Sequence, residues 1–271
     1  MLQRRLASST HAILRALQRR RDRLEVARVA LVEGRILPPL APPARLDDYD
    51  DELDAGEAEQ LEEDVVDAAT AARTAEELAT EILVLDSLVA LATRVRDLGQ
   101  DRKWAELRSP ILDHGLLHDE HDEHGEPRKL IVFTEHRDTL DYVAAQVRNV
   151  FGRDDPVVTI HGGTPRVERR RIRESFTHDP TCQVLVATDA AGEGLNLQAA
   201  NLMINYDLPW NPNRIEQRFG RIHRIGQKRV CRLWNLVAED TREGAVFIRL
   251  LENMETQRRA YGGRLFDVLG E

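Results

Sequence analysis

The second half of the chain alternates short apolar runs with helical stretches, and this alternation restricts the possible folds more than any other feature. The apolar runs have the length and composition of buried strands and lie at 129–133, 157–160, 184–187, 202–205 and 230–237. Helical stretches separate and follow them at 139–150, 166–176, 212–222 and 242–258. Strands that alternate with helices pair in parallel. The sequence therefore predicts an α/β fold with a doubly wound parallel sheet.

The first 126 residues have a different texture and are expected to form a helical connector. Apolar residues at helical spacing predict one amphipathic helix over 1–33 and further helices over 74–99 and 101–117. The prolines of 37–43 predict an extended linker, and the acidic run 47–67 predicts either a solvated helix or a disordered tail. We expect two domains, 1–126 and 127–271.

Charge is strongly segregated along the chain. The net charge of −9 argues against a basic protein that coats nucleic acid, but arginines cluster at 4–28, 166–173 and 214–232. A local basic face is therefore expected. No run approaches the length of a membrane span and no signal peptide is present, so the sequence predicts a cytoplasmic protein without a membrane partner. Cys182 and Cys231 lie in apolar stretches, which predicts reduced, buried thiols.

A histidine-rich and acidic tract lies at 114–126. Four histidines close together could indicate a metal site, but the tract shows no stable element that would fix the ligands in place. A hydrated linker is the favoured interpretation, and no metal site is predicted.

Ligands of doubly wound sheets bind beyond the carboxyl ends of the strands, so the loops there are the candidate site. Gly192 and Gly194 follow the third predicted strand, where a missing side chain lets the backbone approach a phosphate or a neighbouring domain. A plain tight turn is the alternative. Arg218, Arg221 and Arg224 recur every three residues, which predicts one helix face suited to a polyanion, with a solvated face as the alternative.

Two long motifs carry a family resemblance. Asp207-Leu-Pro-Trp-Asn-Pro-Asn213 and Gln217-Arg-Phe-Gly-Arg-Ile-His-Arg-Ile-Gly-Gln227 resemble the last motifs of superfamily-two helicases, and the Trp-Asn-Pro and Arg-Ile-Gly-Gln elements resemble the Swi/Snf branch. The resemblance extends over about 129–258 and includes 131–134, 161–163 and 187–194. It implies a RecA-like C-terminal motor lobe.

The resemblance also implies roles for individual residues. Arg221 and Arg224 would be arginine fingers that stabilise charge on the transferred γ-phosphoryl group, and Gln217 would couple them to the nucleotide. The residues implied near ATP are Asp189, Gly192, Glu193 and Gly194. The residues implied to contact DNA are Thr134, His161, Gly162, Gly163, Thr188, Trp210 and Asn211. The family commonly has a glycine where Glu193 stands, which leaves the role of Glu193 open.

The chain has no phosphate-binding loop. None of its three lysines, Lys103, Lys129 and Lys228, lies in a Gly-Lys-Ser/Thr context, and no acidic pair follows an apolar strand. We therefore expect ATP and Mg²⁺ to be bound mainly by an N-terminal helicase lobe absent from this chain, which is not active alone.

The predicted function is the C-terminal lobe of an ATP-dependent double-stranded DNA translocase. An RNA helicase is less favoured. The alternative from another class is a non-catalytic module that binds a protein or DNA, with 47–67 as its docking surface.

Overall fold

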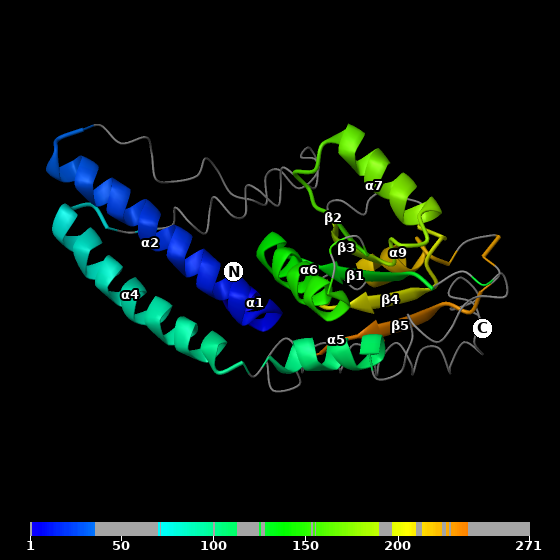
Figure 1. Cartoon of the computed structure of the whole chain (residues 1–271). Helices are drawn as coiled ribbons and strands as arrows, with labels where there is room; N and C mark the ends of the chain where they lie inside the picture. Colours follow the sequence, from blue (N-terminus) through cyan, green and yellow to red (C-terminus); the bar gives the residue numbers. More distant parts are fainter. Residues whose placement is uncertain are drawn as a thin grey trace, which may run out of the picture. The chain divides into compact units, whose positions relative to one another are not determined.

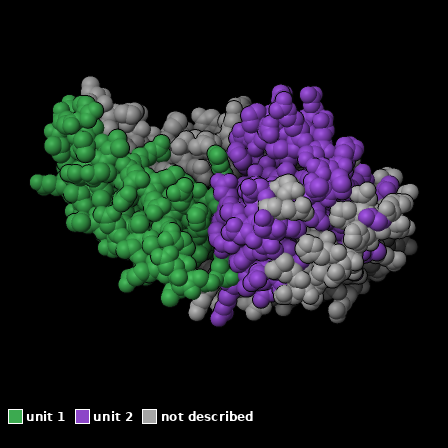
Figure 2. Space-filling view, in the orientation of Figure 1, with its two compact units in different colours: residues 1–101, 136–139 green, residues 102–135, 140–271 purple. Residues whose placement is uncertain are grey.

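The computed structural model describes residues 2–35, 70, 72–99, 101–112, 125, 128–152, 154, 156–189, 197–209, 213–223, 226–227 and 229–237. The chain divides into two compact units, coloured in Figure 2. We call Met1–Asp101 with His136–Thr139 the helical unit, and Arg102–Glu135 with Leu140–Glu271 the sheet unit. None of the described helices is long and apolar enough to cross a membrane.

The helical unit contains a helix pair. Helices α1 (Leu2–Ser8) and α2 (Thr10–Val32) replace the single helix expected over 1–33. That expectation was wrong at Ser9, which has an extended backbone and caps α2 by accepting a hydrogen bond from the Ala12 amide at 3.0 Å. Helix α2 packs along α4 (Ala75–Asp97), as Figure 1 shows. Their shared core contains Ile13, Leu17, Leu24, Ala27, Leu78 and Leu85.

Helix α4 begins with a capping box. The Thr74 hydroxyl accepts from the Glu77 amide at 3.2 Å, and the Glu77 carboxylate accepts from the amides of Thr74 and Arg73. The predicted start of this helix is confirmed. The predicted apolar stripe is only partly buried: Leu78 is fully enclosed, whereas Leu91 is 50% exposed.

The sheet unit is built on five parallel strands in the order β2-β3-β1-β4-β5. The strands are β1 (Leu130–Thr134), β2 (Val157–Ile160), β3 (Val184–Thr188), β4 (Leu202–Asn205) and β5 (Arg232–Asn235). Each predicted strand is found, and the predicted doubly wound parallel sheet is confirmed. β1 lies in the middle of the sheet. β3 and β2 lie on one side of it, and β4 and β5 lie on the other.

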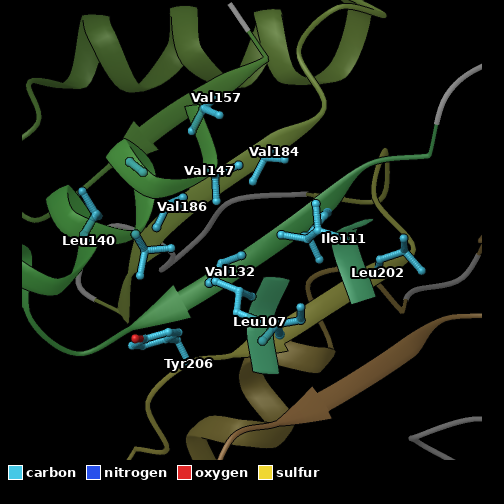
Figure 3. Close-up of a cluster of buried hydrophobic side chains, with 14 residues drawn as sticks. Leu107, Ile111, Val132, Leu140, Val147, Val157, Val184, Val186, Leu202 and Tyr206 are labelled. Atoms are coloured by element: carbon cyan, nitrogen blue, oxygen red, sulfur yellow. The ribbon is translucent and has the colours of Figure 1, made fainter. Parts of the chain in front are cut away.

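Helices cover both faces of this sheet. They are α5 (Arg102–Leu112), α6 (Arg137–Phe151), α7 (Arg166–His178) and α9 (Asn213–Phe219). Alternate strand residues such as Val132 and Val186 pack with Leu107 of α5 and Leu140 of α6 (Figure 3). On the other face, Phe133 shares a core with residues of α7 and α9. The helix expected over 242–258 lies outside the described residues.

Helix α5 belongs to the core of the sheet unit. Leu107 and Ile111 are buried against the same face as α6, and Figure 3 shows both side chains directed toward the strands. The expected domain boundary at 126/127 stays a prediction, but α5 contributes packing to the sheet even though it precedes that boundary.

Candidate functional site

The strand register brings several polar side chains to the carboxyl edge of the sheet. Thr134 at the end of β1 pairs with Thr188 at the end of β3, and Asn205 ends β4 beside Phe133. Asp189 directly follows β3, and Asp207 follows β4 by two residues. The predicted site loops therefore begin at one shared edge, as parallel strands require.

Arg218 of α9 lies at the centre of this edge. Its side chain is only 2% exposed, and its guanidinium donates two hydrogen bonds to the Asp189 carboxylate, at 2.5 and 2.7 Å. The remaining terminal nitrogen donates to Asn205 Oδ1 and to the Asp207 carbonyl, both at 2.8 Å. The guanidinium carbon also lies 5.2 Å from the centre of the Phe133 ring. Arg218 therefore ties α9 to the ends of β1, β3 and β4.

The interpretation that Arg218 and Arg221 share one helix face was wrong, and Arg224, the third member of the predicted row, lies outside the described residues. Helix α9 ends at Phe219, and Arg221 lies in the turn that follows Gly220. Arg218 is directed inward because Asp189, Asn205 and the Asp207 carbonyl together satisfy its buried donors. Arg221 is only partly buried. The two arginines therefore have different environments despite their regular spacing.

The backbone of Arg221 is held on both sides. Its amide donates to the Arg218 carbonyl at 3.1 Å, and its carbonyl accepts from the Leu197 amide at 3.2 Å. Gln227 fixes the next part of the chain, since its side-chain amide donates to the carbonyls of Ile222 and Gln198, both at 3.1 Å. These bonds give the loop that carries Arg221 a defined path.

Asp207 forms a second centre of hydrogen bonding. One carboxylate oxygen accepts from the Thr134 hydroxyl at 2.5 Å and from the Glu135 amide at 3.3 Å. The other accepts from Lys103 Nζ of α5 at 2.8 Å. Asp207 and Lys103 were not predicted as site residues, and Arg218 was predicted only within an arginine row suited to a polyanion. The signals for Asp207 were its place at the start of the first quoted motif and its position two residues after a predicted strand.

The predicted loop after β2 is a compact turn. The Thr164 hydroxyl accepts from the His161 amide at 3.0 Å, and the Thr164 amide donates to the His161 carbonyl at 2.9 Å. Arg169 of α7 donates to the carbonyls of Thr164 and Gly162, at 2.8 and 2.5 Å. A Cβ atom at Gly163 would lie 3.3 Å from the His161 ring, so this close approach favours glycine.

The other predicted site residues differ in how far they face solvent. Gln217 is exposed, whereas Thr134 and Thr188 are buried. Gly192, Glu193, Gly194, Trp210, Asn211 and Arg224 lie outside the described residues. The ligand contacts assigned to all these residues stay predictions.

The described residues do not fit a magnesium or triphosphate-binding site on their own. Lys103 is paired with Asp207, and Lys129 donates to the carbonyls of Phe176 and Asp179. Within the described ranges, no cluster of histidine, cysteine and acidic side chains could hold a metal ion. The ordinary lysine and carboxylate ligands of a nucleotide-bound magnesium are thus not assembled in this part of the chain.

The two thiols precede β3 and β5, at the amino edge of the sheet, and have no assigned chemistry. Cys182 and Cys231 are both free, and Cys182 is fully buried. Desolvation by burial raises the pKa of the Cys231 thiol above its ordinary value. The predicted burial is found for Cys182, whereas Cys231 is only partly buried.

Comparison with known proteins finds one matching family model and several similar sequences. Residues 112–226 match the family model described as "Helicase conserved C-terminal domain". The chain is 41% identical over 143 residues to "Uncharacterized ATP-dependent helicase YqhH" of Bacillus subtilis, which covers 52% of this chain and 24% of that protein. It is 30% identical over 164 residues to "TATA-binding protein-associated factor mot1" of Aspergillus fumigatus, covering 58% of this chain and 9% of that protein.

A solved structure is also similar. "Crystal structure of the C-terminal part of Fun30 ATPase domain" superposes with a TM-score of 0.46 and 20% identity, covering 81% of this chain and 70% of that one. The chain spans about a quarter or less of the length of the two curated relatives above.

Proposed function

We propose, from the match of residues 112–226 to the helicase conserved C-terminal domain and the likeness to an ATP-dependent helicase, that this chain is the C-terminal motor lobe of a Swi/Snf-like double-stranded DNA translocase. In this proposal the chain supplies arginine fingers and contacts to the DNA backbone. A second lobe supplies the phosphate-binding loop and the magnesium ligands. The motor acts in the cytoplasm.

The placement of Arg221 carries the proposal. Its backbone is fixed between Arg218 and Leu197, one turn beyond the buried Arg218 anchor. The side chain is partly exposed. A partly exposed guanidinium on a fixed backbone suits a phosphate group that approaches from a neighbouring lobe.

The chemistry proposed for Arg221 is electrostatic. Transfer of the γ-phosphoryl group to water spreads negative charge over its oxygens, and an arginine finger that meets those oxygens accelerates the step by about 10³-fold or more. Arg224 would act beside it, and Gln217 would orient the pair. Asp189 contributes indirectly by holding Arg218.

The DNA contact is proposed for the compact turn after β2. Gly162 and Gly163 leave the backbone open to close approach, and Arg169 holds this turn from behind through the Gly162 and Thr164 carbonyls. Backbone amides and small side chains suit a sequence-independent grip on phosphates. Thr134 and Thr188 are buried, so their proposed contact with DNA requires the carboxyl edge of the sheet to open when DNA binds.

Complementation of ATP hydrolysis tests the proposal. Turnover should be measured for this chain alone and after addition of a separately produced helicase lobe that carries the phosphate-binding loop, each with and without double-stranded DNA. We expect DNA-stimulated turnover only in the mixture. R221A should reduce kcat by about 10³-fold because the transition-state charge loses its partner.

The matched control is R232A. Arg232 is an exposed arginine at the start of β5, at the amino edge of the same sheet. Its removal should leave turnover unchanged. If R221A and R232A had equal activity, Arg221 would not be a finger; if no mixture hydrolysed ATP while the chain still bound DNA or protein, a non-catalytic interaction module would replace the motor.

A further inference from the structure

Helix α5 reaches the carboxyl edge of the sheet through an ion pair between Lys103 and Asp207. Lys103 Nζ lies 2.8 Å from Asp207 Oδ1, with side chains only 18% and 6% exposed. The ammonium group also lies 4.9 Å from the centre of the Tyr206 ring. This contact joins positions 104 residues apart in the chain. Such a part-buried, charge-assisted bond is stronger than an exposed surface pair.

Asp207 connects this ion pair to Arg218. Its carboxylate is shared between Lys103 and the Thr134 hydroxyl, which fixes the orientation of the residue. Its carbonyl accepts from Arg218 at 2.8 Å. We call the acceptors around the Arg218 guanidinium, which are Asp189, Asn205 and the Asp207 carbonyl, the Arg218 socket. The Arg218 carbonyl in turn accepts a hydrogen bond from the Arg221 amide. A continuous path of hydrogen bonds therefore runs from α5 to the Arg221 turn.

We propose that Lys103 is a positioning residue for Arg221, and that α5 is the element through which the preceding part of the chain influences the site. This inference rests on the proposed function for its catalytic consequence. Lys103 does not contact the nucleotide in this scheme. It holds Asp207 so that the Arg218 socket, and with it the Arg221 turn, keeps one geometry.

The packing of α5 makes this coupling effective. Leu107 and Ile111 fix the helix on one face of the sheet, while Lys103, about one turn earlier, holds it at the edge. A displacement of α5 must therefore either break the Lys103 to Asp207 bond or move Asp207. Because α5 is the first helix of the sheet unit in chain order, a displacement of the residues just before it acts on Asp207 through this bond.

The chain offers a closely matched control lysine. Lys129 is also largely buried, donates to the carbonyls of Phe176 and Asp179, and lies 5.3 Å from the centre of the Phe176 ring. It precedes β1 and so lies at the amino edge of the sheet. K129M removes a comparable cation without touching the carboxyl edge.

Amide hydrogen exchange on the whole chain tests the positioning role without requiring any catalytic activity. K103M should accelerate exchange in 205–209 and 213–223 by about fivefold or more relative to amides of β1, because these segments lose a shared anchor. K103R, which keeps the charge, should restore protection. K129M should instead accelerate exchange around 176–182. The inference would be overturned if K103M accelerated amide exchange equally in all segments, or if it did not accelerate exchange in 213–223.

Turnover in the complemented motor supplies the second readout. K103M should lower kcat with the KM for ATP unchanged, since Lys103 positions the finger and does not bind substrate. K103R should recover kcat. If K129M lost as much kcat as K103M, Lys103 would contribute only to stability and not to the position of Arg221. If the unaltered mixture shows no turnover, the proposed function fails, and the exchange experiment still decides whether Lys103 orders the Arg221 turn.

Discussion

The Arg218 guanidinium and the Asp189 carboxylate form a bidentate ion pair, with hydrogen bonds of 2.5 and 2.7 Å. Planar guanidinium and carboxylate groups match in this geometry, which fixes direction as well as distance. The pair joins α9 to the end of β3, two elements that carry the most distinctive motifs of the chain. It therefore sets the position from which the Arg221 turn begins.

Removal of Arg218 should destabilise the sheet unit strongly. R218M keeps much of the side-chain volume but removes the bidentate partner of Asp189, and we expect a loss of about 3 kcal/mol in the free energy of unfolding. Urea denaturation followed by circular dichroism measures this loss. Arg214 provides the control, because it is 55% exposed and lies 3.9 Å from the same carboxylate. R214M should cost less than about 0.5 kcal/mol; a comparable loss in both variants would contradict the anchoring role of Arg218.

DNA binding should depend steeply on salt. A grip on the phosphate backbone releases counterions, so three phosphate contacts would weaken binding about 40-fold between about 50 and 200 mM salt. Fluorescence anisotropy with duplexes of unrelated sequence measures both the slope and the lack of sequence preference. R169M should weaken binding by loosening the 161–164 turn that Arg169 supports. An affinity that stays flat over this salt range would count against a backbone grip.

The start of α4 should become less stable in acid. Hydrogen bonds from the backbone amides of Arg73 and Thr74 lower the pKa of the Glu77 carboxyl below its ordinary value of 4.5. A lowered pKa in the folded state means that the ionised carboxylate stabilises α4 above pH 4.5 and that this contribution is lost as the pH falls through the lowered value. E77Q should therefore lower the melting temperature at pH 7 and leave it unchanged in strong acid.

The other half of the capping box gives the contrast. T74A removes the hydroxyl that accepts from the Glu77 amide, and this hydrogen bond involves no titrating group on Thr74. Part of its effect should therefore persist in strong acid, at about 1 kcal/mol or less. Identical pH profiles for T74A and E77Q would show that Glu77 does not titrate as the cap requires.

Local patterns predicted the elements of the sheet unit well. The apolar runs gave all five strands, with 157–160 and 202–205 matching their observed bounds. The signal is clearest for β1, β3 and β4, because a strand buried on both faces must be apolar throughout. The capped start of α4 was also predictable, since the Thr74 and Glu77 pair acts within four residues. The break at Ser9 was missed because its neighbours continue the helical spacing on both sides.

The site was predictable as a location but not as a network. Carboxyl-edge loops followed from the strands, and the motifs directed attention to Arg221. The inward direction of Arg218 could not follow from spacing, because Arg218 and Arg221 have the same periodic relation to their neighbours and differ only in which partners lie nearby.

By itself, the sequence determined that this protein has strands and helices in alternation and that basic motifs follow the strand ends, because periodicity and local composition act over a few residues. Only the tertiary structure decided the strand order β2-β3-β1-β4-β5 and the partners of the buried charges. Asp189, Asn205 and Asp207 meet around Arg218 because β1, β3 and β4 pair in register, and Lys103 reaches Asp207 across 104 positions. A buried cation takes the direction in which its hydrogen bonds are satisfied, and that direction is set by the packed strands.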